Sequence, residues 1–395
     1  MYYIFNPDND LALANFSPSY TPPASAVKLG IDLSLLPLWY ADNEAVVAQS
    51  NIDDSFIANV NKLFGISSKV IQLSEMSLIE KSELNITPWG WSPMIKNKLL
   101  NAGIEADVLP TNAYIGTIRE YSNRKNAVAV LRELKTYDNK YLGDSYFFTD
   151  IEDLLVYLSS TEGDKALKMP LSGSGRGLIW VLGSITDKQT DWARRVIRNQ
   201  GGVVAEPKLD RVQDFAMEFS MSNGVATFEG YSLFETAASG AYMGNVLMRD
   251  NEIENYLSEY ISIEQLHYLQ NQLQNQLQSY FPLYEGILGV DMMICSTNNG
   301  YGLYPCVEIN MRMNMGMVSH IFYERFVDNQ SKGHYRVDYF KKPGEALTHH
   351  QKMTMDFPLI LENARIILGY MALTPVDVDT NYVAWVDIKR PTDSR

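Results

Sequence analysis

Short apolar runs alternate with segments of helical periodicity through the first hundred residues. The runs YYIF, LLPLWY and KVIQL predict strands, whereas DDSFIANVNKLFG and SPMIKNKLLNAG, each closed by a glycine, predict helices. Strands that alternate with helices are typical of a parallel α/β sheet, in which ligands bind at the carboxyl ends of the strands. The polar turn Asn6-Pro7-Asp8-Asn9-Asp10 follows the first strand. Two roles stay open for it, a substrate site or an Asx-rich helix cap, and we favour the cap.

The rest of the chain mixes helices with strands joined by tight turns. A charged helix is predicted from residue 117, in TIREYSNRKNAVAVLRELK, and a strand in ALKMP. Several more strands are predicted after GGVVA, with turn residues at Asn223-Gly224. The pattern of PLILENARIILGYMA predicts a helix, and that of NYVAWVDI a strand. ISIEQLHYLQNQLQNQLQSY predicts a packing helix, whose apolar stripe consists of Leu266, Leu269, Leu273 and Leu277.

The segment YPCVEINMRMNMG, residues 304–316, alternates between apolar and polar side chains. On a strand, alternate residues point to opposite faces, so one face carries oxygen ligands and a guanidinium. A solvent-facing strand gives the same alternation, and the pattern alone does not separate the two interpretations. The polar face consists of Glu308, Asn310, Arg312 and Asn314, and the apolar face of Val307, Ile309, Met311 and Met313.

The pair Asn299-Gly300 lies between two alternating runs and predicts a two-residue hairpin turn in which both residues take positive φ. Pairing Asn298 with Tyr301 then places Asp291 opposite Glu308, with Asn310 one step further on the same face. Two facing carboxylates repel each other unless something intervenes, and with an amide oxygen they form a donor set that Mg²⁺ accepts. A solvated carboxylate, or a register slip at Pro305, is the alternative.

A lysine and a glycine-rich loop follow the strand ALKMP. Backbone N–H groups of such a loop can surround phosphate oxygens while Lys168 neutralises charge, although a flexible turn has the same composition. The spacing matches neither the P-loop nor the dinucleotide-binding fingerprint. The loop residues are Ser172, Gly173, Ser174, Gly175, Arg176 and Gly177.

A second candidate nucleotide contact follows the apolar run GGVVA. An acid and a proline at a strand end can offer backbone groups to a base, and nearby carboxylates can accept ribose hydroxyls. An ordinary strand end is the alternative. The residues are Glu206, Pro207, Lys208 and Leu209, followed by Asp214 and Glu218.

The charge and composition of the chain argue against several classes of function. The formal net charge of −14 makes nucleic acid and anionic membranes poor partners. No apolar run approaches eighteen residues and the first residues lack signal-peptide features, so we expect a cytoplasmic protein. The two cysteines, Cys295 and Cys306, and the five scattered histidines support neither a zinc site nor a hydrolase. Both cysteines are interpreted as core thiols.

These segments, in this order, resemble the ATP-grasp superfamily of carboxylate–amine and carboxylate–thiol ligases over roughly residues 117 to 320. The resemblance implies a parallel α/β domain at 1–115 that precedes a two-lobed ATP-grasp fold with antiparallel sheets. The lobes would be 116–205, with the glycine-rich loop, and 206–395, with the hinge and the metal site. Departures are Met169 between the lysine and Pro170, and Ala205 where a second acid is common.

The resemblance also implies roles for the candidate residues. Lys168 and residues 172–177 would hold the phosphates of ATP, the segment 206–209 the adenine, and Asp214, or in its place Glu218, the ribose. Mg²⁺, or Mn²⁺ as a substitute, would bind Asp291, Glu308 and Asn310. Arg312 would meet the γ-phosphate or the acylphosphate, and either Arg124 or Lys125 would enter the nucleotide site.

The expected reaction joins a carboxylate to an amine or similar nucleophile through an acylphosphate, with ATP converted to ADP. A small-molecule kinase and a non-catalytic nucleotide-binding protein are the alternatives. Small-molecule substrates are the expected partners, and a homodimer is a reasonable default. The acceptor contacts, each more in keeping with a structural role, are Asp8, Asp10, Trp89, Trp91, Arg249 and His320.

Overall fold

The computed structural model describes residues 1–49, 51–173, 177–236 and 242–390. The chain forms two compact units. The first comprises Met1–Gly116, Met243–Glu252 and Met313–Arg395, and the second comprises Thr117–Tyr242 and Ile253–Arg312. The first segment ends at Gly116, whereas the sequence suggested a domain boundary after residue 115. The segment 206–395, expected as one lobe, is shared between the two units.

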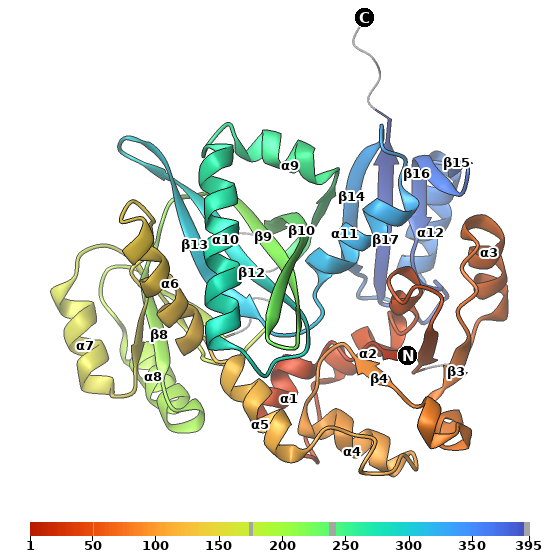
Figure 1. Ribbon diagram of the computed structural model, residues 1–395, viewed down its shortest axis with the longest axis horizontal. Helices are drawn as coiled ribbons and strands as arrows, with labels where there is room; N and C mark the ends of the chain where they lie inside the picture. Colours follow the sequence, from red (N-terminus) through yellow and green to blue (C-terminus); the bar gives the residue numbers. More distant parts are fainter. Residues whose placement is uncertain (50, 174–176, 237–241, 391–395) are drawn as a thin grey trace, which may run out of the picture. The chain divides into compact units, whose positions relative to one another are not determined.

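The first unit contains a parallel sheet that confirms the expected N-terminal α/β fold (Figure 1). The strand order is β3-β2-β1-β4. The strands are β1 (Tyr2–Ile4), β2 (Ala45–Ala48), β3 (Val70–Gln72) and β4 (Ile86–Pro88), and the helices are α1 (Asn9–Asn15), α2 (Ala24–Asp32), α3 (Asp54–Phe64) and α4 (Pro93–Asn101).

The run LLPLWY is not a strand. It forms a buried 3₁₀ turn, Leu36–Trp39, and the strand lies further on, at Ala45–Ala48. A short, continuous apolar run does not distinguish a buried strand from a buried helical turn, and Pro37 suits the first turn of a helix because its missing N–H needs no partner there. Trp39 donates its indole N–H to the carbonyl of Leu373 at 2.6 Å and packs in the core of this unit.

The later segments of the first unit form antiparallel strands in the order β11-β14-β17-β16-β15. The helix predicted over residues 358–372 is wrong, because this segment is a hairpin in which Asn363 and Ala364 take positive φ of 50° and 59°. The elements are β11 (Tyr242–Leu247), α11 (Met315–Phe326), β14 (Lys332–Tyr339), α12 (Glu345–Asp356), β15 (Ile360–Glu362), β16 (Arg365–Ala372) and β17 (Tyr382–Lys389).

The second unit contains an antiparallel sheet of order β5-β8-β6-β7. Two helices pack on it through a core that includes Leu154, Leu167, Val196 and Val203. The elements are β5 (Tyr146–Phe148), α7 (Ile151–Ser160), β6 (Lys165–Lys168), β7 (Leu178–Val181), α8 (Asp187–Gln200) and β8 (Val203–Pro207).

Long antiparallel strands in the order β13-β12-β9-β10 form the other sheet of the second unit. Helices α6 and α10 contact it, as Figure 1 shows. The elements are β9 (Arg211–Ser222), β10 (Val225–Thr236), β12 (Gly286–Thr297), β13 (Gly300–Asn310), α6 (Lys125–Tyr137) and α10 (Ile263–Tyr280), with α5 (Asn112–Tyr121) and α9 (Asp250–Leu257) at the junctions of the segments.

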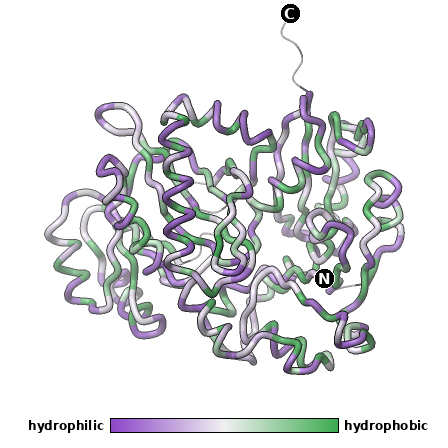
Figure 2. Tube along the Cα trace, viewed as in Figure 1, coloured by the Kyte–Doolittle hydropathy of each residue, from purple (hydrophilic) through white to green (hydrophobic). Residues whose placement is uncertain are grey.

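Helix α10 confirms the predicted leucine stripe. Leu266, Leu269, Leu273 and Leu277 are all buried, and hydrophobic and hydrophilic residues alternate along the helix (Figure 2). Burial of each leucine side chain contributes roughly 1.5–3 kcal/mol, so this stripe fixes the helix to the unit. Among the helices in the described part of the chain, none combines the length and hydropathy needed to cross a bilayer.

Candidate functional site

Asp291 on β12 lies directly opposite Glu308 on β13, as predicted. The neighbouring pair Gly289 and Asn310 lies on the same face because residues two apart on a strand point the same way. The carboxylates are therefore brought together by the backbone pairing of two adjacent strands.

The route to this pairing differs from the predicted one. The hairpin closes at Thr297 and Gly300, so Asn298 and Asn299 form the turn, and the predicted pairing of Asn298 with Tyr301 is wrong. The side-chain oxygen of Thr297 accepts the Asn299 N–H at 3.3 Å, and Gly300 takes the positive φ, 115°.

A bulge then restores the predicted register. Between the pairs Met293–Tyr304 and Asp291–Glu308, one residue of β12 faces three residues of β13, including Pro305. Pro305 has no N–H to contribute to the ladder, so a bulge accommodates it. Two extra residues on one strand return the side chains to the same face, which keeps Glu308 beside Asp291.

The paired carboxylates carry an electrostatic cost. Burial raises the pKa of Asp291 well above its ordinary value, and the negative charges of Glu308 and Glu218 raise it further. The Asn310 amide donates to Asp291 at 3.1 Å and opposes this rise, as does the nearby Arg312. A carboxylate in this environment favours either a proton or a cation.

The donor set fits a hard divalent cation. Two carboxylates on facing strands and an amide oxygen one pair further along supply the oxygen ligands that Mg²⁺ takes, with its other positions filled by phosphate or water. Within the described residues, no cluster of three or more His, Cys, Asp or Glu side chains with metal-binding geometry occurs. A divalent cation here would therefore need Asn310 and further ligands from a bound molecule in addition to the two carboxylates.

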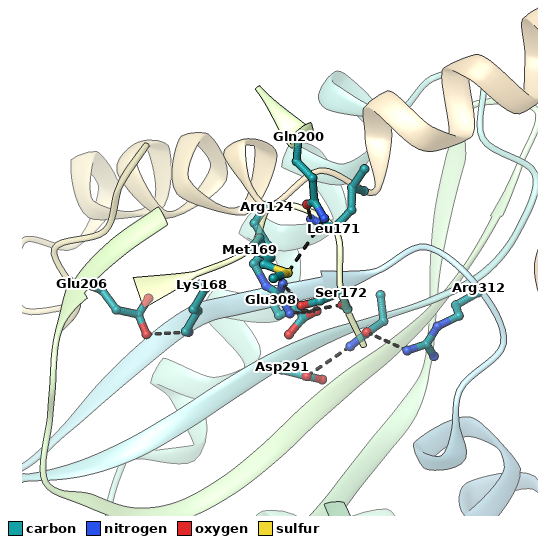
Figure 3. Close-up of polar contacts among 11 residues, drawn as sticks. Arg124, Lys168, Met169, Leu171, Ser172, Gln200, Glu206, Asp291, Glu308 and Arg312 are labelled. Carbon is teal, nitrogen blue, oxygen red and sulfur yellow. Dashed lines mark hydrogen bonds and ion pairs between the residues drawn. The ribbon is translucent and has the colours of Figure 1, made fainter. Parts of the chain in front are cut away.

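Arg124 places a positive charge against this site. One nitrogen of its guanidinium lies 2.5 Å from Glu308, and the side chains of these two residues are only 10% and 24% exposed (Figure 3). Lys125, the alternative left open by the sequence, pairs at 2.8 Å with Glu120 and is largely exposed. The structure thus separates two adjacent basic residues and brings Arg124 to the carboxylates.

The start of the glycine-rich loop is held on two sides. Arg124 donates to the carbonyl of Met169 and to the hydroxyl and carbonyl of Ser172, while the Leu171 N–H donates to the Gln200 side chain at 2.9 Å. Gly177, at the far end, takes a φ of 75° and accepts the Met169 N–H at 2.8 Å. Gly173 is the last described residue before the gap, and Ser174, Gly175 and Arg176 lie outside the described residues.

Lys168 forms a buried ion pair that the sequence did not indicate. Its Nζ lies 2.5 Å from Glu206, and the two side chains are only 13% and 8% exposed. Glu206 also accepts hydrogen bonds from the Tyr304 hydroxyl at 3.0 Å and from Ser145 at 3.4 Å. The ion pair between Lys168 and Glu206, shown in Figure 3, holds the ammonium at the end of β6 next to β8.

Lys168→Ala is expected to destabilise the protein by about 3 kcal/mol, because it would leave Glu206 buried without its cationic partner. The double variant Lys168→Ala/Glu206→Gln should recover most of this loss, since it removes both charges. Urea unfolding of both variants measures the difference. Equal free energies of unfolding for the single variant and the parent protein would contradict the energetic importance of the pair.

The remaining hinge residues have other neighbours. The backbone N–H of Lys208 donates to the Asp164 carbonyl at 2.9 Å, and its half-exposed side chain lies over the Trp180 ring. Pro207 ends β8 opposite Lys165, and Leu209 follows it in the connection to β9. These contacts of the segment are structural, so its predicted contact with adenine stays a prediction.

Both candidate ribose acids lie on β9. Asp214 accepts from Thr236 at 2.6 Å and from Arg211 at 2.9 Å, and burial raises its pKa despite these bonds. Glu218 is 1% exposed and lies across β12 from Asn310, since both pair with Gly289. Glu218 therefore belongs to the carboxylate face by register, whereas Asp214 lies further along the strand, opposite Met293.

The predicted polar face ends earlier than expected. Strand β13 stops at Asn310, and Arg312 lies beyond it, where its guanidinium donates to the Asn310 side-chain oxygen at 3.2 Å. Asn314 is not on this face: it is the N-cap of α11, and its side-chain oxygen accepts the Met317 N–H at 2.9 Å. Asparagine is favoured at this cap position for this hydrogen bond, which the strand pattern concealed.

The candidate acceptor contacts lie in the first unit. Trp89 is buried edge-on against Phe5, and His320 lies 3.5 Å from Asp250, which suits structural roles. Arg249 pairs with Glu252, Trp91 packs on an apolar cluster, and Asp10 lies in the first turn of α1. Asp8 occupies the cap position of α1 but makes no side-chain cap bond.

Both cysteines are buried thiols, as expected, and free. Burial raises the pKa of Cys295 to about 12, and burial together with the charge of Asp291 raises that of Cys306. Neither is activated for nucleophilic chemistry.

Tyr304 and Gln200 are the site residues that sequence reasoning missed. Tyr304 is fully buried, and burial followed by the charge of Glu206 raises its pKa. Tyr304 precedes Glu308 by four residues, so the strand alternation places both on the same face, and this pattern could have identified it as a site residue. Gln200, the last residue of α8, offered no signal because its contact with the loop depends on tertiary packing.

No family model matches the chain, and no curated protein matches its sequence. Solved structures do. The biotin carboxylase domain of the Hydrogenobacter thermophilus 2-oxoglutarate carboxylase is 10% identical over 98% of this chain and 85% of its own, with a TM-score of 0.55. The Campylobacter jejuni biotin carboxylase in its β,γ-ATP complex is 10% identical over 98% and 87%, with a TM-score of 0.53.

The Thermus thermophilus N5-carboxyaminoimidazole ribonucleotide synthetase is 10% identical over 98% of this chain and 93% of its own, with a TM-score of 0.50. At such low identity, the likeness to these three enzymes shows a shared fold.

Proposed function

Because the chain has the ATP-grasp fold, we propose that it is an ATP-dependent, ADP-forming ligase that joins a carboxylate to an amine or similar nucleophile through an acylphosphate. The observation that carries the proposal is the pairing of Asp291 with Glu308 across two strands, in a setting that raises the pKa of Asp291 and so favours a bound cation. Fold alone does not define activity, whereas this pair supplies specific chemistry.

Cationic side chains of the same unit surround the proposed nucleotide site. Lys168 ends β6, Arg124 precedes α6, and Arg312 follows β13. In phosphoryl transfer, charge develops on the transferred phosphoryl oxygens, and positioned cations stabilise it. Bound Mg²⁺, held by Asp291, Glu308 and Asn310, would neutralise further phosphate charge at this place.

The roles of the chain's own residues follow from their positions. Lys168, kept in place by Glu206, would hold a phosphate oxygen, and Arg312 would hold the acceptor carboxylate or the acylphosphate. The loop after Lys168 would cover the phosphates with its backbone N–H groups. The acceptor carboxylate attacks the γ-phosphorus, ADP leaves, and the amine then displaces phosphate from the acylphosphate, so no base is needed for the first step.

The structural neighbours support nucleotide binding. The Hydrogenobacter domain was solved as a dimer with MgADP, ADP and bicarbonate. For this chain we propose ATP with Mg²⁺ or Mn²⁺, and small-molecule carboxylate and amine substrates. A homodimer and a cytoplasmic location belong to the same proposal.

Mg·ATP is expected to raise the melting temperature, because a ligand at about a hundred times its dissociation constant stabilises the folded state by about 2.7 kcal/mol. ATP with EDTA should give a much smaller shift, since the phosphates would then meet Asp291 and Glu308 without a cation between them. Differential scanning fluorimetry measures both. A parent protein that shows no shift with Mg·ATP contradicts nucleotide binding.

A second assay tests ligation. Candidate carboxylates are incubated with Mg·ATP and hydroxylamine, which replaces the unknown amine and converts an acylphosphate into a hydroxamate. ADP release together with hydroxamate supports a ligase, whereas ADP release with a stable phosphorylated product indicates a kinase.

A further inference from the structure

We propose that Arg124 is an internal counter-ion of Glu308 that competes with the divalent cation, so that cation binding also releases the start of the glycine-rich loop. This role rests on the metal site of the proposed function. It makes Arg124 a positioning residue, which acts through Glu308 and the loop.

The guanidinium of Arg124 contacts both the start of the glycine-rich loop and the carboxylate of Glu308. One nitrogen donates to the Met169 carbonyl and to the Ser172 hydroxyl, and the other donates to the Ser172 carbonyl at 3.3 Å and to Glu308 at 2.5 Å (Figure 3). The planar fork of arginine allows this, whereas the single ammonium of a lysine could not span both partners. The metal ligand and the loop are therefore joined through one side chain.

The cluster is electrostatically incomplete without a cation. Arg124 supplies one positive charge next to Glu308, while Asp291 lies directly opposite Glu308 and Glu218 belongs to the same face of the sheet by register. Arg124 also has a buried Nε that lacks a hydrogen-bond partner in the described part of the chain. A buried donor without a partner lowers the stability of the folded state. Moving the guanidinium to a partner that satisfies this donor, such as a phosphate oxygen, is therefore energetically favourable.

A divalent cation at Glu308 would lie next to the guanidinium, and two positive charges in contact repel each other. Glu308 therefore exchanges one positive partner for the other. Once the guanidinium leaves Glu308, its bonds to the Met169 carbonyl and to Ser172 are lost as well, and, within the described residues, only the backbone N–H of Arg124, which donates to the Pro170 carbonyl at 3.0 Å, still links it to this segment. Cation binding should then loosen residues 169–173 before any nucleotide is present.

The first test measures Mn²⁺ binding to the nucleotide-free protein by electron paramagnetic resonance. Arg124→Gln should bind Mn²⁺ about tenfold more tightly than the parent protein, because a charge-assisted competitor for Glu308 is removed. Lys125→Gln is the matched control. It also removes one positive charge, but Lys125 is the next residue along the chain and forms an exposed ion pair with Glu120. This variant should change the Mn²⁺ affinity less than about twofold. Unchanged or weaker binding by Arg124→Gln overturns the proposal.

The second test follows hydrogen exchange of the backbone amides of residues 169 and 171–173, since Pro170 has no N–H. In the parent protein, Mn²⁺ alone should accelerate exchange there, and in Arg124→Gln exchange should already be fast and insensitive to Mn²⁺. Arg124→Lys keeps the charge but not the fork, so it should retain the parent's Mn²⁺ affinity with faster exchange. Slow exchange in Arg124→Lys, or no response of the parent loop to bound Mn²⁺, argues against the link.

The two proposals fail in different ways. If the parent protein binds no Mn²⁺ even with ATP in excess, the metal site and the proposed function are both wrong. If it binds Mn²⁺ with ATP but the Arg124 variants behave like the parent, only the counter-ion role is wrong.

Discussion

Glu308→Gln should lower Mg²⁺-dependent ATP turnover by a factor of about 10² to 10³, while the fold is retained. The substitution keeps the size of the side chain and an oxygen that can accept from Arg124, but it removes one of the two charges that face each other across β12 and β13. Loss of one preorganised electrostatic contact at a reacting phosphate has an effect of this size. Release of ADP at saturating Mg·ATP, with the best carboxylate substrate, measures it.

Glu229→Gln is the matched control for this variant. Glu229 is exposed on β10 of the same unit and bonds to Ser220, so its neutralisation should leave turnover unchanged. Circular dichroism and the melting temperature verify that both variants are folded. If Glu308→Gln turns over ATP at the parent rate, the carboxylate pair has no part in the reaction.

Asp291→Asn should stabilise the metal-free protein and abolish its stabilisation by Mg·ATP. The ionised Asp291 is disfavoured by burial, by Glu308 and by Glu218, and an uncharged isostere removes this penalty. We therefore expect Asp291→Asn to have a higher free energy of unfolding than the parent protein at neutral pH. Urea unfolding without metal, and melting curves with Mg·ATP, test the two parts.

The pH dependence follows from the direction of the shift. The pKa of Asp291 is higher in the folded state than in the unfolded state. At pH values between these two pKa values, the folded state therefore binds more protons than the unfolded state. The parent's stability relative to Asp291→Asn should therefore fall as pH rises above about 4, and level off once the folded-state carboxyl is ionised. A difference that is constant or grows with pH would contradict the raised pKa.

Asp191→Asn controls for the general effect of removing one negative charge from a chain of net charge −14. Asp191 is exposed on α8, 3.6 Å from Arg194. It should change stability by less than about 0.5 kcal/mol and leave the Mg·ATP shift intact.

Two Asn-Gly pairs show what the sequence can and cannot predict. At Asn223-Gly224 both residues take positive φ, 51° and 74°, and close the hairpin between β9 and β10 as predicted. At Asn299-Gly300 the turn lies one residue earlier, since Thr297 supplies a side-chain acceptor and Gly300 takes the positive φ alone. A competing local hydrogen bond changes which residues form the turn, and the dipeptide does not reveal it.

The facing carboxylates were nevertheless predicted correctly because two departures cancelled. The turn shifted the pairing by two, and the bulge around Pro305 shifted it back by two. An even shift preserves the face of every side chain, whereas an odd one would have moved Glu308 away from Asp291. The alternation of apolar and polar residues thus predicts which face of a strand a side chain is on more reliably than the turn residues predict which residues pair.

The contacts of Arg124 and Lys168 could not be predicted from the sequence. Both depend on partners distant along the chain, Glu308 and Glu206, and on the packing of helices and strands that brings them together. The pattern provided residue types and faces but no distances between elements.

The division of the chain also has a consequence for biosynthesis. The core of the first unit includes Phe5 and Trp39 from its first segment and Phe322 and Tyr335 from its last. A ribosome adds about 5–20 residues per second, so the roughly 200 residues between these segments take tens of seconds to emerge. During that interval the nascent first segment exposes apolar surface that the later segments of the same unit cover in the finished fold, so chaperones are expected to bind it there.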